Sequence, residues 1–317
     1  MGTVIGVDLG GTKVLAAAVD EDGSASGHGK EVTPESGPAA VVELIAQAVA
    51  SIDDGPVAVG VGVPGPVADG VVVQAANLVG WGANVPLADM LAEAIGAPVV
   101  LGNDANVGTL GEARHGAGRG SDSVLGCWLG TGVGGGLVLH GRVHEGFSGT
   151  AGELGHVPVE MTHPRRCGCG RWGCVEAYAG RASLEAMVSR HQAEGNTSEM
   201  VQIMADKGKD RFTSGVWKSA LKSGDPIATE LIDESVAALS IALAGAINLL
   251  DLQTIVFGGG LAEKLGQDHV DRIAEATLPR LMAPDVPRSW VVATLGDDSG
   301  VVGAAELARS TKLADLT

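Results

Sequence analysis

Short apolar runs and longer amphipathic stretches alternate along the whole chain. The runs Val4–Asp8 and Val14–Val19 flank a turn with two glycines, which is the signal of a β-hairpin. A second hairpin is predicted for Ser123–Leu129 and Leu137–His140, with a glycine-rich turn between them. Further strands are predicted at Pro56–Val63, Val71–Ala75, Pro98–Leu101, Thr254–Phe257 and Val291–Leu295.

Apolar residues at helical spacing fill most of the intervals between these strands. Helices are predicted at Ala39–Ile52, Leu87–Ile95, Ala105–Arg114, Gly180–Glu194, Ile227–Leu250, Asp268–Met282 and Val301–Ser310. Alternating strands and helices with two matching hairpins predict an α/β protein of two similar halves with a cleft between them. We expect a small domain over residues 1–105, onto which a C-terminal helix at about 301–312 packs, and a large domain over residues 106–300.

Length, charge and hydropathy narrow the class of protein. The chain has 317 residues, 45% of them hydrophobic, which suggests about two domains with a sizeable core. The net charge of −17 argues against a protein that grips nucleic-acid phosphates through a basic face. The longest apolar tract, Val236–Leu250, is too short for a membrane span of ~20 residues, and no secretory signal is visible. We therefore expect a cytoplasmic protein with no nucleic-acid or membrane partner.

The two glycine-rich turns are candidates for phosphate binding. The N–H groups of Gly10, Gly11 and Thr12 could surround an anion, and the glycines from Gly130 to Gly136 allow a close backbone approach. Their spacing of 120 residues suggests a duplicated fold with two phosphate loops that face one another. The alternative is two ordinary hairpin turns in a chain with 49 glycines. A third group, Gly258–Gly260, follows a strand and could let a flat ring lie against the backbone.

A polar pair, Asn103 and Asp104, lies between a predicted strand and a predicted helix. Ligands of open α/β sheets gather at such strand ends. Asn and Asp are also favoured helix N-caps, so the local sequence by itself favours a capping role for Asp104 over a catalytic one.

The densest cluster of metal-ligand residues follows the second hairpin. Cys167, Cys169 and Cys174 form a C-x-C-x4-C pattern, and His156 lies eleven residues upstream. Three thiolates and one imidazole would close a tetrahedral zinc site and leave no position for water, so the pattern predicts a structural metal. The alternative is a set of free thiols in a tight loop. The fourth cysteine, Cys127, is predicted to be a core residue.

Two carboxylates, Glu153 and Glu176, flank this cluster. Carboxylates accept hydrogen bonds from hydroxyl groups, so a polar ligand with several hydroxyls, such as a sugar, could bridge them.

Together these motifs resemble the ROK family (repressor, open reading frame, kinase), and most closely its bacterial glucokinases. The resemblance runs from Gly6 to about Arg309. It depends on Asp8–Lys13, Asn103–Asn106, Leu129–Gly136, and most specifically on Glu153–His156 followed by Cys167–Glu176.

The resemblance implies an actin-like ATPase (ribonuclease H-like) fold and phosphoryl transfer from ATP to a hexose, foremost to the 6-hydroxyl of glucose. It makes Asp104 the general base and Asp8 the carboxylate on the Mg²⁺ side. His156 would use one ring nitrogen for zinc and the other for the sugar. The implied hexose-binding residues are Gly65, Asn77, Asn103, Asp104, Glu153, His156 and Glu176. The implied ATP-binding residues are Asp8, Gly10, Gly11, Thr12, Lys13, Gly130, Thr131, Gly132, Val133, Gly134, Gly258, Gly259 and Gly260, with the role of Lys13 left open.

Several alternatives stay open at this point. The substrate could be fructose, N-acetylmannosamine or N-acetylglucosamine, and polyphosphate could replace ATP as donor. A sugar-sensing regulator without turnover and an actin-like ATPase of chaperone type are alternatives from other classes. No helix-turn-helix domain is expected before the first loop, which begins at Val4. Gly102 stands where the family pattern has a bulkier residue such as Glu, and the family habit suggests a homodimer or homotetramer.

Overall fold

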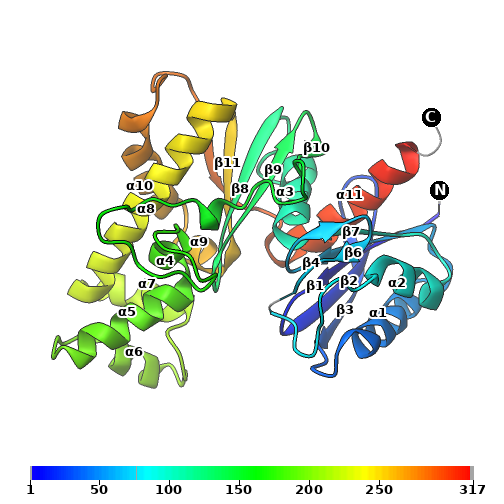
Figure 1. The fold of residues 1–317 in the computed structure, drawn as a ribbon, viewed down its shortest axis with the longest axis horizontal. Coiled ribbons are helices and arrows are strands. Elements are labelled where there is room, and N and C mark those ends of the chain that lie inside the picture. The colour runs from blue at the N-terminus through cyan, green and yellow to red at the C-terminus, as the bar shows by residue number, and fades with distance from the viewer. Residues whose placement is uncertain (1, 76, 315–317) are drawn as a thin grey trace. The chain divides into compact units, whose positions relative to one another are not determined.

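The structure, a computed structural model, describes residues 2–75 and 77–314, with side chains to residue 311. Its contacts divide the chain into two compact units. Unit 1 comprises Met1–Gly126, Gly136–Gly152 and Ala293–Thr317, and unit 2 comprises Cys127–Gly135 and Glu153–Val292. Figure 1 shows the elements of both units.

Strands and helices alternate through the described residues, as the sequence predicts. The strands are β1 (Val4–Leu9), β2 (Lys13–Val19), β3 (Ala25–Val32), β4 (Ala58–Val63), β5 (Val67–Ala68), β6 (Val71–Val72), β7 (Val99–Asn103), β8 (Ser123–Leu129), β9 (Val133–Leu139), β10 (Arg142–Val143), β11 (Thr254–Gly258) and β12 (Ser289–Val292). The helices are α1 (Pro38–Ile52), α2 (Leu87–Ile95), α3 (Asp104–His115), α4 (Glu176–Ala179), α5 (Arg181–Ala193), α6 (Met200–Asp206), α7 (Ser214–Ser223), α8 (Pro226–Leu250), α9 (Gly259–Leu265), α10 (Gln267–Thr277) and α11 (Ser299–Ala314). Short 3₁₀ turns cover Leu154–His156, Leu278–Arg280 and Gly296–Asp298.

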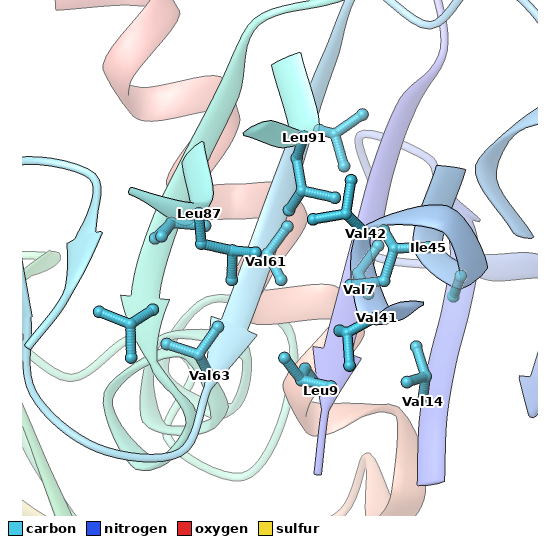
Figure 2. Close-up of a cluster of buried hydrophobic side chains, with 14 of the residues drawn as sticks. Val7, Leu9, Val14, Val41, Val42, Ile45, Val61, Val63, Leu87 and Leu91 are labelled. Atoms are coloured by element: carbon cyan, nitrogen blue, oxygen red, sulfur yellow. The ribbon is translucent and has the colours of Figure 1, made fainter. Parts of the chain in front are cut away.

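The first sheet, in unit 1, has the strand order β3-β2-β1-β4-β7. β1 pairs antiparallel with β2, whereas β1, β4 and β7 run parallel. Successive side chains of a strand point to opposite faces, and here both faces are buried. Residues such as Val7 and Val61 pack under α1 and α2, as Figure 2 shows, while Val4 and its neighbours on the other face pack under α11.

The helix α11 lies unusually close to the strands and to α3. A Cβ atom on Gly6 would lie 1.8 Å from the carbonyl oxygen of Val301, and one on Gly303 would lie 1.6 Å from that of Val107. Only a residue without a side chain allows backbones to approach this closely. Glycine at these positions therefore lets α11 pack directly on β1 and on α3.

The second sheet has the strand order β10-β9-β8-β11-β12. Within unit 2, β11 and β12 run parallel, and the long helix α8 packs against α4, α5, α7 and α10. The apolar half of α8 is mostly buried, as its composition predicts.

The predicted bounds of α1, α2, α3, α5 and α8 hold within one residue, but other elements differ for identifiable reasons. The predicted helix to Met282 ends at Thr277, because Pro279 lacks the N–H group that a helix needs. The predicted strand Val291–Leu295 ends at Val292, because the N–H groups of Thr294 and Leu295 bond a side chain instead.

Three further differences concern β9, β6 and β3, and the first of them involves glycine. β9 begins at Val133 rather than at Leu137, so most of the expected turn is strand. A Cβ on Gly136 would lie 2.5 Å from the carbonyl oxygen of Ala105, so this glycine serves close packing against α3 rather than a turn. β6 covers only Val71–Val72 of the expected Val71–Ala75, and β3 is an exposed strand whose polar sequence gives no signal.

The compact units do not coincide with the expected ranges 1–105 and 106–300. The expected boundary falls within α3, and all of that helix belongs to unit 1. The C-terminal helix α11 packs on β1, β4 and α3 of the same unit.

Among the described residues, no helix has both the length and the apolar composition needed to cross a membrane.

A buried histidine in α10 predicts how the stability of unit 2 depends on pH. His269 is 4% exposed, and neither ring nitrogen has a hydrogen-bond partner among the described residues. Burial, with a smaller contribution from Arg272, lowers its pKa from 6.5 to about 4. The unfolded chain therefore binds more protons between pH 6.5 and 4, and stability falls by up to about 3 kcal/mol as the pH drops through this window.

We expect His269→Leu to remove most of this loss, measured as the thermal midpoint at pH 7.5, 6 and 5. His144→Leu, which changes an exposed histidine, is the matched control and should keep the parent's pH dependence. A parallel pH dependence for His269→Leu and the parent would contradict the assignment.

Candidate functional site

Asn103, not Asp104, caps the helix that follows β7. The Asn103 side chain accepts hydrogen bonds from the N–H groups of Ala105 and Asn106. Asp104 is the first residue of α3, and its Oδ1 accepts from the N–H of Ala105 at 2.8 Å. The capping role that the local sequence favours for Asp104 is therefore wrong, because its neighbour already fills that position.

Asn103 also connects Asp104 to the loop after β4. Its Nδ2 donates to the Oδ1 of Asp104 at 3.1 Å and to the carbonyl oxygen of Gly65 at 3.2 Å. Gly65 has φ 107°, and a Cβ there would lie 2.2 Å from the carbonyl oxygen of Gln74, so only glycine fits. Three of the predicted hexose-binding residues of unit 1 thus lie in one hydrogen-bonded group.

The first glycine-rich loop has only part of the expected anion-binding backbone. The N–H of Gly10 donates to the carbonyl oxygen of Lys13 and closes the hairpin, so it is not available to a phosphate. In the described part of the chain, the N–H groups of Gly11 and Thr12 donate to no protein acceptor. A Cβ on Gly11 would lie 2.7 Å from the carbonyl oxygen of Asn77, which places this predicted hexose residue beside the loop.

Asp8 and Lys13 lie at the two ends of this loop. Burial raises the pKa of Asp8 to about 6; Lys13 lowers this pKa and Asp297 raises it. The carboxyl is therefore mostly ionised at neutral pH, as a Mg²⁺ ligand must be. The Nζ of Lys13 lies 3.0 Å from the Oδ2 of Asp297, which gives this lysine a definite ion-pair partner. The sequence gives no sign of Asp297 as a partner, because 284 residues separate it from Lys13.

The second glycine-rich loop, in unit 2, also contains a short-range backbone hydrogen bond. The N–H of Gly130 donates to the carbonyl oxygen of Gly132, and the carbonyl oxygens of Gly130 and Thr131 accept from the first residues of α5. The Nη2 of Arg181 donates to the Oγ1 of Thr131 at 3.1 Å. The expected loop is therefore tied to α5, and Gly134 lies within β9.

Glu176 joins this loop to the cysteine cluster. Its Oε2 accepts from the N–H of Val133 at 3.1 Å, and its Oε1 lies 3.3 Å from the Sγ of Cys167. A Cβ on Gly132 would lie 2.2 Å from the same Oε2, so glycine is needed beside the carboxylate. The N–H of Val133 is therefore engaged by Glu176 and not open to a phosphate.

The four predicted metal ligands lie together in unit 2. The ligand atoms of His156, Cys167, Cys169 and Cys174 all lie within 4.8 Å of one another. Zinc–sulfur bonds of 2.3 Å require ligand atoms about 3.8 Å apart in a tetrahedron. The Sγ atoms of Cys169 and Cys174 are 3.9 Å apart, and the Sγ of Cys167 is 4.0 Å from the Nδ1 of His156. The donor set and its spacing fit a closed zinc site.

The other ring nitrogen of His156 points toward Glu153. Its Nε2 lies 3.9 Å from the Oε2 of Glu153, and both side chains are partly exposed. Nδ1 therefore faces the cysteines while Nε2 and the carboxylate remain accessible on the far side of the ring. By contrast, Cys127 is fully buried in β8, and burial raises the pKa of its thiol to about 12, which fits a core residue.

The three glycines at the end of β11, beside which a flat ring could lie, differ in their surroundings. Gly259 and Gly260 begin the helix α9, and a Cβ on Gly258 would lie 2.2 Å from the Trp128 ring. The space beside Gly258 is thus already taken by a ring of the protein. Beside Gly260, the nearest atom to a Cβ would be the Oγ of Ser214 at 3.6 Å, an ordinary contact.

Gly102 has a clear packing reason. A Cβ at this position would lie 2.6 Å from Val107 and 2.8 Å from Leu307. These two side chains occupy the space behind Asp104 that a bulkier residue would need.

The candidate residues are thus divided between the two units. Unit 1 brings together the first loop, Asp8, Gly65, Asn77, Asn103 and Asp104, and unit 2 holds the second loop, the cluster, Glu153, Glu176 and Gly258–Gly260. Each unit therefore contains one glycine-rich loop and a set of polar groups suited to phosphate and hydroxyl ligands. That combination on two similar sheets defines a nucleotide-dependent phosphotransferase with the actin-like ATPase fold.

Comparison with known proteins identifies the family. The model of the ROK family matches residues 4–311. A glucokinase of Thermotoga maritima is 37% identical over 96% of both chains, and an N-acetyl-D-glucosamine kinase of Photobacterium profundum is 32% identical over 95% of this chain and 98% of its own. The crystal structure of a ROK family glucokinase from Streptomyces griseus, in complex with glucose and AMPPNP, superposes with a TM-score of 0.81 at 35% identity, covering 98% of this chain and 100% of that one. The chain belongs to the ROK family.

Proposed function

We propose that this ATP-dependent hexose kinase of the glucokinase type phosphorylates the 6-hydroxyl of D-glucose, with Asp104 as general base. Similarity over nearly the full length to glucokinases supports the substrate class, and relatives that act on N-acetylated hexoses keep other hexoses as the alternative. The observation that carries the proposal is the position of Asp104. Its carboxylate stands at the start of α3, oriented by Asn103 and the N–H of Ala105.

Asp104 accepts the proton of the sugar hydroxyl as its oxygen attacks the γ-phosphorus in line. The proposed hexose-binding residues besides Asp104 are Asn103, Gly65 and Asn77, which belong to unit 1, and Glu153, His156 and Glu176, which belong to unit 2. Because Nδ1 of His156 faces the thiols, Nε2 is the nitrogen that meets a sugar hydroxyl.

The two glycine-rich loops hold the phosphates, chiefly through the N–H groups of Gly11 and Thr12 in the first loop. Gly130–Gly134 form the second loop, and Gly258–Gly260 support the adenosine. Lys13, paired with Asp297, braces the first loop rather than serving as an unpaired cation. Mg²⁺, held on the side of Asp8, supplies neutralisation of the phosphate charge when bound.

Zinc, when bound by His156, Cys167, Cys169 and Cys174, fixes the shape of the segment that carries these four residues together with Glu153 and Glu176. Four protein ligands leave no open position, so no reaction step depends on the metal. A homodimer or homotetramer in the cytoplasm remains our expectation for the assembly.

Coupled detection of ADP over a panel of hexoses tests the proposal. We expect D-glucose to give the highest kcat/KM among glucose, fructose, N-acetylmannosamine and N-acetylglucosamine. A higher kcat/KM with an N-acetylated hexose would favour that alternative. If no sugar gives ADP but sugar binding is measurable, the result would favour a sugar-sensing regulator without turnover. If sugar phosphate forms with polyphosphate and without ATP, polyphosphate would be the phosphoryl donor.

A further inference from the structure

We infer that Glu112 is a positioning residue for phosphoryl transfer. It holds α3, the helix that carries the proposed general base Asp104, in a fixed position relative to the first phosphate loop. The inference rests on the proposed roles of Asp104 and Asp8. Glu112 lies eight residues after Asp104 in α3, so about 12 Å along the same helix. Its side chain is completely buried.

Both carboxylate oxygens of Glu112 accept hydrogen bonds from groups distant in the sequence. Oε1 accepts from the N–H of Leu295 at 2.9 Å, the hydroxyl of Ser299 at 2.9 Å and the N–H of Thr294 at 3.1 Å. Oε2 accepts from the N–H of Ala117 at 2.8 Å and from the N–H of Thr294 at 3.1 Å. A buried carboxylate is stable only with such partners, and here they all come from two short segments.

The segment that Glu112 holds, residues 294–300, reaches the first phosphate loop. Asp297 pairs with Lys13 at 3.0 Å and with Lys30 at 3.7 Å. At the end of the segment, a Cβ on Gly300 would lie 2.8 Å from the Cγ of Asp8. The segment therefore touches both ends of the loop at Asp8 and Lys13.

One side chain thus connects two parts of the unit 1 site. At one end, α3 carries Asp104, and at the other, residues 294–300 support Asp8 and Lys13. Glu112 touches neither substrate nor reacting atoms in this arrangement, so its effect is on the relative position of these groups. A glutamine cannot replace it fully, because an amide has only one acceptor oxygen and its NH₂ would face N–H donors.

Ser299→Ala tests the inference with little risk to folding, since it removes one donor to Glu112 and leaves the carboxylate in place. In Ser299→Ala we expect the Kd for MgATP to rise, and the kcat/KM for MgATP to fall, by about 10-fold each. In Glu112→Gln the same two changes should be about 10²-fold. The Kd for the hexose, measured by calorimetry without nucleotide, should stay within 2-fold. Ser299→Thr keeps the hydroxyl and should restore the parent values.

Ser310→Ala is the matched control in the same helix, because the hydroxyl of Ser310 donates to the helix carbonyl oxygens of Glu306 and Leu307. It should behave as the parent. Unchanged MgATP parameters in both Ser299→Ala and Glu112→Gln would overturn the inference. The inference would also be overturned if the MgATP parameters and the hexose Kd changed equally, the thermal midpoint fell, and Ser299→Thr did not restore the parent values. That is the behaviour of a purely structural residue.

The MgATP titration separates this inference from the proposed function. If the parent phosphorylates no hexose, the proposed function fails, while the difference in MgATP affinity between the parent and Ser299→Ala still decides the role of Glu112.

Discussion

Asp104→Asn should lower kcat for hexose phosphorylation by about 10² to 10⁴ and leave the hexose Kd within a few-fold. Asparagine keeps an acceptor oxygen for the N–H of Ala105, but it cannot take the proton of the attacking hydroxyl. The stability of α3 should not change, because Asn103 and not Asp104 is the N-cap of this helix. Steady-state detection of ADP gives kcat, and calorimetry without nucleotide gives the sugar Kd.

Asp89→Asn is the matched control for this prediction. Asp89 is an exposed carboxylate in the first turn of α2, also in unit 1, and its loss should change neither parameter. If Asp104→Asn keeps the parent's kcat, Asp104 is not the general base. If the variant loses sugar binding but turns over bound sugar normally, Asp104 is a binding residue instead.

Cys174→Ser should remove the zinc, taking the metal content from about one equivalent per chain to near zero. Cys174 is 1% exposed, and its Sγ lies 3.9 Å from that of Cys169. Loss of a structural metal is among the few single changes that cost about 4 kcal/mol or more, which corresponds to a fall of ~10 °C in the thermal midpoint. The hexose KM should rise by about 10- to 10²-fold, since His156 loses its orienting partner.

Cys127→Ala provides the control for the metal measurement. It also changes a buried cysteine of unit 2, but one outside the cluster, so the variant should retain one equivalent of zinc even if it is less stable. Active parent protein that contains no zinc after purification would refute the structural metal. A Cys174→Ser variant with the parent's zinc content would refute the ligand set.

Local patterns explain why much of the architecture could be predicted. The bounds of α2 follow from helical spacing within nine residues, and β1 follows from a short, mostly apolar run of six residues. The C-x-C-x4-C pattern predicts that its three thiols lie close together, because the glycines between the cysteines allow a short, tight loop. In each case the residues that decide the structure are neighbours in the chain.

The same reasoning could not identify residues whose role depends on distant partners. Glu112 looks like one more polar residue of a helix, and all its hydrogen-bond partners except Ala117 lie more than 180 residues later. Asp297 and Lys13 are equally distant, and Gly136 looked like a turn residue although it packs against α3. Asp104 was a plausible cap until the structure showed Asn103 in that position.

The sequence by itself determined the α/β class, the two glycine-rich hairpins, and which four residues are the candidate zinc ligands, because each depends on residue type and spacing over short stretches of chain. Only the tertiary structure decided which N–H groups remain for a phosphate, which ring nitrogen of His156 faces the thiols, and that α11 and residues 294–300 return to support the first loop. These depend on close contacts between segments far apart in the chain, and no local pattern records which segments will meet.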